Sequence, residues 1–521
     1  MPVRSLTTLG TALTMMFWGV LPGGQVPPPK PERVVSTIVP LPASVTSVRF
    51  PGYTADGSRV LAAATSTGFR GTQLVSFTED GTGLRCLTCQ AWNGPELLKP
   101  IAFPDGRRVL VRIGSQTPDA PADHGVVECV PSVIDCRRAT VVPIVPPAAG
   151  DPNVEQDQRE FRLAPDGRHV ALSQVRRTAS GRPTGVGIVG RLARHGDAYQ
   201  VEDARVVATD GELKGFTPDG QAVTFARFLN AFEAGNPDVV EVDLRSGRES
   251  RLTSALDWDE DVDFAPGRHK GRRWMVVGSA RTTGLLETFS QIRRPAFIEE
   301  GVPALPFAAF TARNPEIAEP WLVDEHDTRG SYTGQPLAPG AIAAGWDSKP
   351  NFRWRPDGTA VLFWQQQVRG TRTRVVVAHL PERTPARRGP ARPAPTPSWA
   401  PPVAGHVPPD LRPVAHHAGK ISGSIDITRR PSPLPPFAYL LEVTYTNYAD
   451  EPGFVLNGIE RSYYGKPGLY GAPSRYSADL AVSGRHSGYL TANNVLIQPN
   501  AISGTIESEL DGRHLSLGPL P

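Results

Sequence analysis

The chain has 521 residues, including 51 glycines and 54 prolines, and apolar residues make up 39% of it. This mixture favours an all-β protein with many turns and disfavours a helical bundle. The formal net charge is only +3, from 55 basic and 52 acidic residues, so nothing suggests nucleic-acid binding, which usually requires a clustered basic surface.

The N-terminus resembles a targeting signal. Arg4 precedes a largely apolar run from Leu6 to Leu21, and Pro22-Gly23-Gly24 ends that run. A short positive start followed by such a run predicts a secretory signal peptide, here residues 1–26. The run is shorter than the ~20 residues that span a bilayer, although an uncleaved anchor is the alternative. No other segment is predicted to cross a membrane, so we expect a secreted, periplasmic or cell-surface protein.

The four cysteines support an exported location. They are Cys86, Cys89, Cys129 and Cys136. An even number of cysteines in an exported chain predicts disulfides, and proximity in sequence favours Cys86–Cys89 and Cys129–Cys136. A four-cysteine zinc site is the alternative, because Cys86 and Cys89 have half of the required spacing. The wider spacing of the second pair weakens that interpretation, and free thiols are the third possibility.

A short motif recurs six times between residues 53 and 358. Each copy has an apolar or aromatic residue, then Pro-Asp-Gly or a variant of it, then an apolar strand. The copies are Tyr53–Gly57, Phe103–Gly106, Leu163–Gly167, Phe216–Gly220, the degenerate Phe264–Gly267, and Trp354–Gly358. Proline fixes φ at the first turn position, aspartate bonds back to its own backbone and glycine accepts a positive φ, so each copy predicts a β-hairpin.

In the first and fourth repeats two more strands follow the hairpin, and the last of them ends in Leu-Thr, at Leu87-Thr88 and Arg251-Leu252-Thr253. Four-stranded antiparallel units repeated at a regular spacing are typical of propeller blades. These residues resemble the WD40-like (PD40) repeat of TolB-type propellers over roughly residues 33–381. The resemblance implies an all-β, six-bladed β-propeller. It says little about function, because such propellers serve as docking platforms, carbohydrate-active enzymes and peptidase subdomains.

Two departures from the repeat are informative. The last blade lacks a fourth strand, and residues 34–39 form a spare strand before the first hairpin. We therefore expect that strand to complete blade six, which would close the ring and remove a sheet edge. The fifth and sixth copies are further apart than the others, and the excess lies between Arg281 and Glu319. It predicts either an ordered loop on its own blade or a lid or partner surface beside the channel.

The remainder of the chain has two parts. Residues 382–412 are rich in Pro and Arg, which predicts a stiff, extended linker rather than a folded unit. Residues 413–521 show alternating apolar and polar positions, which predict a small antiparallel β-sandwich or meander. Its polar cluster could hold Ca²⁺, although an ordinary polar turn is the simpler interpretation. The cluster comprises Asn447, Asp450, Glu451, Asn457 and Glu460.

The expected site lies at the mouth of the central channel. In this fold, the segments between one blade's last strand and the next hairpin cross that face, and here they are rich in Trp and carboxylates. The candidate ligand-binding residues are Trp92, Glu96, Asp157, Glu160, Glu212, Lys214, Asp257, Trp258, Asp259, Glu260, Asp261, Trp346 and Asp347. Converging carboxylates could bind a cation, a sugar or a basic peptide, and Trp could stack on a sugar ring or a cation. The alternative is that these aspartates only brace turns between blades.

No reaction is evident in the sequence. The chain has no G-x-S-x-G elbow, so a propeller peptidase is not expected. The eleven histidines show no metal-ligand spacing, although ligands could still converge across blades, and no cofactor is evident. We therefore expect a secreted or cell-envelope binding protein whose propeller mouth engages an envelope protein or a glycan. The alternative is a polysaccharide lyase or glycoside hydrolase that uses two channel carboxylates.

Overall fold

The computed structural model describes residues 27–114, 122–181, 183–227, 236–281, 286–295, 318–327, 334–386, 391–409, 415–465, 474–498 and 501–518. The regular structure in these ranges is almost entirely β, with one short helix, α1 (Glu287–Ser290), so the all-β prediction is confirmed. The expected signal peptide lies outside these ranges. Within them, no helix has the length and apolar character needed to cross a membrane.

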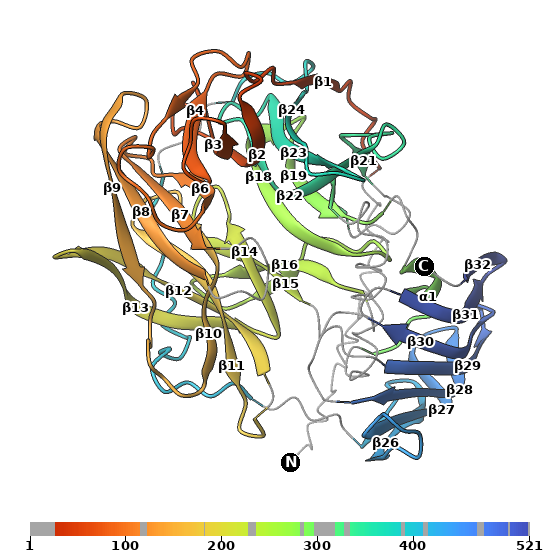
Figure 1. Ribbon diagram of the computed structural model, residues 1–521. Helices are drawn as coiled ribbons and strands as arrows, with labels where there is room; N and C mark the ends of the chain where they lie inside the picture. The colour runs from red at the N-terminus through yellow and green to blue at the C-terminus, as the bar shows by residue number, and fades with distance from the viewer. Residues whose placement is uncertain are drawn as a thin grey trace, which may run out of the picture. The chain divides into compact units, whose positions relative to one another are not determined.

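Six four-stranded sets follow one another as blades (Figure 1). The first strands of neighbouring blades contact one another or, between blades two and three, are joined by an ion pair, so they are the inner strands. They are β2 (Val45–Tyr53), β6 (Leu97–Ala102), β10 (Val154–Leu163), β14 (Gly211–Phe216), β18 (Asp259–His269) and β22 (Trp346–Trp354). The second strands are β3 (Val60–Ser66), β7 (Arg108–Gly114), β11 (His169–Arg177), β15 (Ala222–Arg227), β19 (Arg272–Ser279) and β23 (Ala360–Gln367).

The third and fourth strands complete each blade. The third strands are β4 (Gln73–Phe77), β8 (Ala122–Pro131), β12 (Pro183–His195), β16 (Asp238–Asp243), β20 (Glu319–Asp324) and β24 (Thr373–His379). The outer strands are β5 (Arg85–Cys86), β9 (Cys136–Val145), β13 (Ala198–Thr209), β17 (Glu249–Arg251), β21 (Gln335–Pro336) and β1 (Val35–Ile38). Strand β1 pairs antiparallel with β24, so the first and last strands of the ring share one sheet.

The repeated turns have the backbone that their residues predict. In five copies the glycine has a positive φ, between 66° and 75°. The aspartate accepts from the backbone two residues on, as in Arg107 N to Asp105 Oδ1 at 2.8 Å. The degenerate fifth copy differs, because β18 runs through Pro266-Gly267 and the turn moves to Lys270-Gly271.

Both expected disulfides, Cys86–Cys89 and Cys129–Cys136, are formed, which rules out the zinc interpretation.

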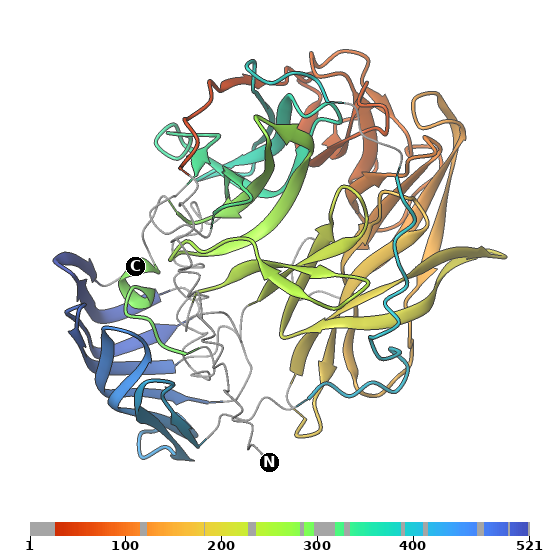
Figure 2. The ribbon, with the colours of Figure 1, turned by 180° about the vertical axis from the view of Figure 1, so that it is seen from behind.

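The Pro/Arg-rich segment does not cross open solvent as a free spacer (Figure 2). Residues 391–409 contain no helix, and their only strand-like feature is an isolated bridge between Arg205 and Pro402. Trp399 Nε1 donates to Leu244 O at 3.0 Å, and Ala394 N donates to Asp166 Oδ2 at 2.9 Å. The segment is therefore bound to the blades by its own hydrogen bonds.

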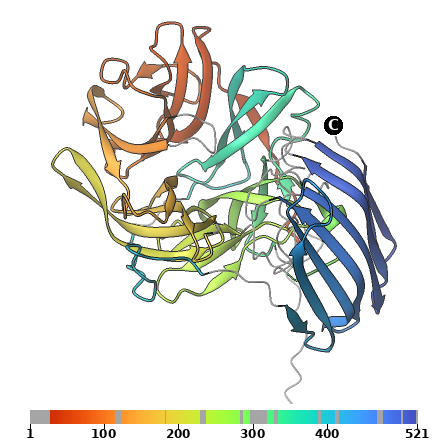
Figure 3. The same ribbon diagram turned by 60° about the horizontal axis from the view of Figure 1, so that its bottom comes forward.

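The C-terminal residues form a meander in one sheet, not a two-sheet sandwich (Figure 3). Each strand pairs antiparallel with the next, in the order β25 (His416–Ala418), β26 (Ser422–Pro431), β27 (Tyr439–Glu451), β28 (Phe454–Tyr464), β29 (Ser474–Gly484), β30 (Gly488–Gln498), β31 (Ala501–Leu510) and β32 (Arg513–Leu517). Alternate residues make one face apolar, as the period-two pattern predicts.

The described start of the blade-five insertion, residues 286–295, packs on that apolar face. Leu286, Phe289 and Ile292 share one buried cluster with the sheet. Gln291 Nε2 donates to Ser508 Oγ at 2.5 Å, and Ser508 Oγ donates to Thr288 O at 2.6 Å. The insertion therefore supplies core to the C-terminal sheet, which neither sequence interpretation of it included. Residues 296–317 lie outside the described ranges.

Candidate functional site

Every inner strand has a register shift in its pairing with the second strand of its blade. Such β-bulges redirect side chains and are common beside functional sites. Four residues at these shifts have a positive φ although they are not glycine, namely Phe50, Lys99, Glu160 and Asn351. A non-glycine residue rarely adopts this conformation, so the strands depart from regular pairing where they present side chains to the channel.

The inner strands of blades two to five bring acids and bases together in two sets of ion pairs. A hydrogen bond from Arg162 Nε to Lys214 O at 2.9 Å connects the two sets, and we call the whole group the channel belt. The channel belt comprises Lys99, Arg159, Glu160, Arg162, Glu212, Lys214 and Glu260. Lys99 Nζ lies 2.7 Å from Glu160 Oε1, and Glu160 also contacts Arg162. Glu212 contacts both Arg159 and Lys214. Lys214 Nζ lies 2.5 Å from Glu260 Oε1, which extends the belt to blade five.

Burial and neighbouring charges oppose each other in the channel belt. Burial raises the pKa of Glu212, but Lys214 and Arg159 outweigh it and lower that pKa to about 2. For Glu260 burial dominates, and Glu212 and Asp261 add to it, so its pKa is raised despite the contact with Lys214. In the channel belt, therefore, the carboxylates of Glu212 and Glu260 contact the same Lys214 ammonium, and their pKa values are shifted in opposite directions.

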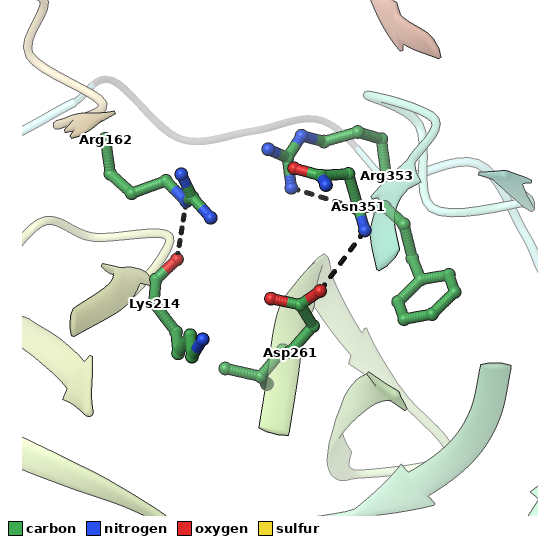
Figure 4. Close-up of a pocket in the computed structure, with 7 residues that line it drawn as sticks. Arg162, Lys214, Asp261, Asn351 and Arg353 are labelled. Carbon is green, nitrogen blue, oxygen red and sulfur yellow. Dashed lines mark hydrogen bonds between the residues drawn. The ribbon is translucent and has the colours of Figure 1, made fainter. Parts of the chain in front are cut away.

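A small cavity lies beside the channel belt (Figure 4). It is lined by Arg162, Lys214, Asp261, Val262, Asn351, Phe352 and Arg353 and is narrow, and its roughly 200 Å³ of empty space includes space open to solvent. Asp261 Oδ2 accepts from the backbone of Asn351 at 3.3 Å. Arg353 Nη1 donates to Phe352 O at 2.9 Å. The lining thus combines residues of blades three, four, five and six.

The structure brings five of the residues expected from the sequence to the belt and cavity: Glu160, Glu212, Lys214, Glu260 and Asp261. Four others have separate partners. Glu96 pairs with Arg49 at 2.8 Å, Asp347 contacts Lys349, Trp92 donates to Pro95 O at 2.7 Å, and the Arg374 guanidinium lies 4.0 Å from the Trp346 ring. Asp157 is exposed near the start of β10.

Three neighbouring candidate residues in blade five, Trp258, Asp259 and Asp257, are buried and bonded to other groups of the protein. The indole of Trp258 is buried in the apolar cluster of the C-terminal sheet, and its Nε1 donates to Glu260 Oε2 at 2.9 Å. Asp259 is fully buried and pairs with Arg281, which also pairs with Asp327. Asp257 is 1% exposed and accepts from the backbone N–H of Trp258 at 2.9 Å.

Asp257 predicts a pH dependence of stability. Burial raises its pKa to about 7, whereas an aspartate in an unfolded chain has a pKa of about 3.9. The folded state then binds more protons than the unfolded state between these values, so stability falls as pH rises from about 4 to about 7. We expect Asp257→Asn to remove this decline. Its melting temperature should exceed that of the unmodified protein at pH 8 and approach it at pH 4.5, and an equal offset at both would contradict the assignment.

Sequence reasoning found Lys214 but missed the other basic partners. Arg159 and Arg162 lie close to Glu160 on β10, so their positions in the sequence alone could have identified them as its basic neighbours. Lys99, Arg281 and Arg353 join the sites only through contacts between blades or with distant chain segments.

Across the described ranges, no group of three or more His, Cys, Asp or Glu residues could hold a metal ion. Of the residues considered for Ca²⁺, Glu460 accepts from the hydroxyls of Tyr445 and Tyr476, and Asp450 accepts from Lys420 N.

No protein-family model and no curated protein matches the chain. Among solved structures, a putative TolB from Agrobacterium tumefaciens has 15% identity and a TM-score of 0.32, covering 55% of this chain and 75% of that one. An oligogalacturonate lyase from Vibrio parahaemolyticus has 11% identity and a TM-score of 0.37, covering 68% and 99%. The propeller domain of the Trilobed protease from Pyrococcus furiosus has 9% identity and a TM-score of 0.33, covering 69% and 99%. At these values the likenesses carry no argument about function, and the six-bladed assignment rests on the strand pairing.

Proposed function

We propose that this chain is a secreted or cell-envelope binding protein that engages a protein or glycan partner at the channel of its propeller. The observation that carries the proposal is the channel belt, in which the inner strands of four successive blades place acids and bases beside one cavity. Fixed charges at a concave site give orientation and specificity to a ligand. The two disulfides are compatible with an oxidising compartment outside the cytoplasm.

The state of the carboxylates and tryptophans favours binding over glycan cleavage. Glu160 and Glu212 are already neutralised by neighbouring cations. Trp258 is buried, Arg374 covers one side of the Trp346 ring, and the Trp92 ring lies against Gly94 of its own turn. A sugar-cleaving site needs a free acid and a free base on either side of a bound ring, whereas Glu160 and Glu212 are each held in ion pairs.

Site-specific photo-crosslinking tests the binding proposal. A photo-reactive amino acid replaces Asp157, which is exposed near the start of β10. The matched control replaces Arg168, which is exposed in the hairpin turn at the other end of the same strand. We expect residues 27–521 with the probe at 157 to form a discrete adduct in envelope extract, which excess unmodified protein removes. Adducts at both positions, or only at 168, would place the binding surface elsewhere.

One observation supports the enzyme alternative. Glu212 and Glu260 contact the same Lys214 ammonium, and their pKa values are shifted in opposite directions, which is the usual condition for a base and an acid. In that case Glu260 would be the proton donor. Incubation with polysaccharide fragments for hours would then release shorter products, and Glu260→Gln would abolish the release. No breakdown by the unmodified protein would leave the binding function.

A further inference from the structure

Two charged groups that line the cavity have no ion pair with any residue that the structure describes. They are the guanidinium of Arg353 and the carboxylate of Asp261. The other two charges of the lining are neutralised, because Arg162 contacts Glu160 and Lys214 contacts both Glu212 and Glu260. Arg353 donates one hydrogen bond, to Phe352 O, and Asp261 accepts one, from Asn351 N.

Arg353 therefore has donors to spare. A guanidinium carries five N–H donors in a planar fork, which matches a carboxylate bidentately. Burial is the main cause that lowers the pKa of Arg353 below its usual value, which reflects the cost of keeping the cation away from water without a close counter-ion. Figure 4 shows its side chain directed toward the space shared with Arg162, Lys214 and Asp261.

The charge balance of the cavity restricts the ligand. One unpaired cation and one unpaired anion face the same space, so a dianion such as phosphate would meet a single available guanidinium and be repelled by Asp261. A single carboxylate beside an O–H or N–H donor satisfies both groups at once, because the donor can bond to Asp261 Oδ1.

We propose that this cavity binds a carboxylate that carries a neighbouring hydroxyl or ammonium group, with Arg353 as the receptor for the carboxylate and Asp261 as the acceptor for the donor. The proposal deepens the binding function proposed above and rests on it. Sugar acids and amino acids share this chemistry, and they differ in whether the donor is a hydroxyl or an ammonium group. Arg353 and Asp261 come from β22 and β18, so the pocket depends on the contact between blades five and six.

The test measures melting temperature and calorimetric binding on residues 27–521 at matched ionic strength. The probes are glucuronate, glutamate, acetate and inorganic phosphate. A ligand that binds only the folded state must raise the melting temperature. We expect a rise with glucuronate, glutamate or both, and a smaller effect with acetate and phosphate. A response to glucuronate alone indicates a sugar acid, and a response to glutamate alone indicates an amino acid.

Three variants decide the role of Arg353. Arg353→Gln should weaken binding of the active probe at least tenfold, and Arg353→Lys, which keeps the charge but loses the fork, should weaken it less. The control is Arg374→Gln, because Arg374 covers Trp346 in the same blade and does not line the cavity. Equal binding by Arg353→Gln, tighter binding of phosphate, or no binding of any probe would overturn the proposal. If the crosslink from position 157 persists in those cases, the binding function stands and only this inference fails.

Discussion

Replacing Arg281 with methionine is expected to lower the free energy of unfolding by about 3–5 kcal/mol, or to prevent folding of blade five. Its guanidinium bonds to Asp259 at 2.7 and 3.1 Å and to Asp327 at 2.7 and 2.9 Å. All three side chains are at most 2% exposed. Removing the arginine would leave two carboxylates buried without their cation, and burial already raises the pKa of Asp259 despite the pair. Asp259 begins β18, Arg281 follows the end of β19 and Asp327 follows the end of β20, so the loss should loosen those strands together.

The control for this prediction is Arg268→Met in the same blade. Arg268 also forms a two-bond pair, with Glu325 at 2.6 and 3.2 Å, but its side chain is 59% exposed. An exposed ion pair contributes about 0–1 kcal/mol, so this variant should unfold almost as the unmodified protein does. Urea unfolding gives the comparison, and hydrogen exchange shows whether the amides of β18 to β20 lose protection. Similar midpoints for both variants would mean that the buried group does not hold the blade.

The blade architecture could be predicted because its signals are local. Each Pro-Asp-Gly turn constrains its own backbone, and the apolar strand that follows needs only its alternation to be recognised. The fifth copy shows the limit of this reasoning. Pro266-Gly267 lacks the aspartate, and the strand continues through it to a turn at Lys270-Gly271. The strand was predictable there, but the position of its turn was not.

The candidate site was predictable only in part, because its side chains are directed by bulges and by contacts between blades. Asp259 and Asp261 are two residues apart on β18, so a regular strand would place them on one face. A register shift between Asp259 and Val262 separates their roles, and Asp259 pairs with Arg281 whereas Asp261 lines the cavity. Arg353 reaches the same cavity from β22, and no local pattern relates two strands so far apart in sequence.

The contact of Glu32 with Arg383 also joins residues far apart in the sequence, so no local pattern predicted it. Its removal is the second change for which we expect a large loss of stability. Arg383 Nε and Nη2 each donate to the Glu32 carboxylate at 2.9 Å, and both side chains are at most 2% exposed. The Arg383 guanidinium lies 4.8 Å from the ring centroids of both Trp274 and Trp354. Arg383 falls in the segment predicted as a linker, yet it joins the end of the propeller chain to the residues that precede β1.

Glu32→Ala is therefore expected to cost about 3–5 kcal/mol, because it leaves the Arg383 guanidinium buried without its carboxylate. Strand β1 is exposed along its whole length, so it buries little surface of its own, and its pairing with β24 should depend on this ion pair. Loss of β1 would uncover the edge of β24, which predicts lost protection of the β24 amides in hydrogen exchange and concentration-dependent association.

The matched control for this second prediction is Glu382→Ala, which removes the neighbouring carboxylate. Glu382 is half exposed and lies 3.6 Å from the ammonium of Lys270, which is also exposed, so its loss should change stability by less than about 1 kcal/mol. If Glu32→Ala and Glu382→Ala melt alike and β24 stays protected in both, main-chain pairing alone holds β1. If only Glu32→Ala releases β24, the ring is held closed by one buried ion pair between two indole rings.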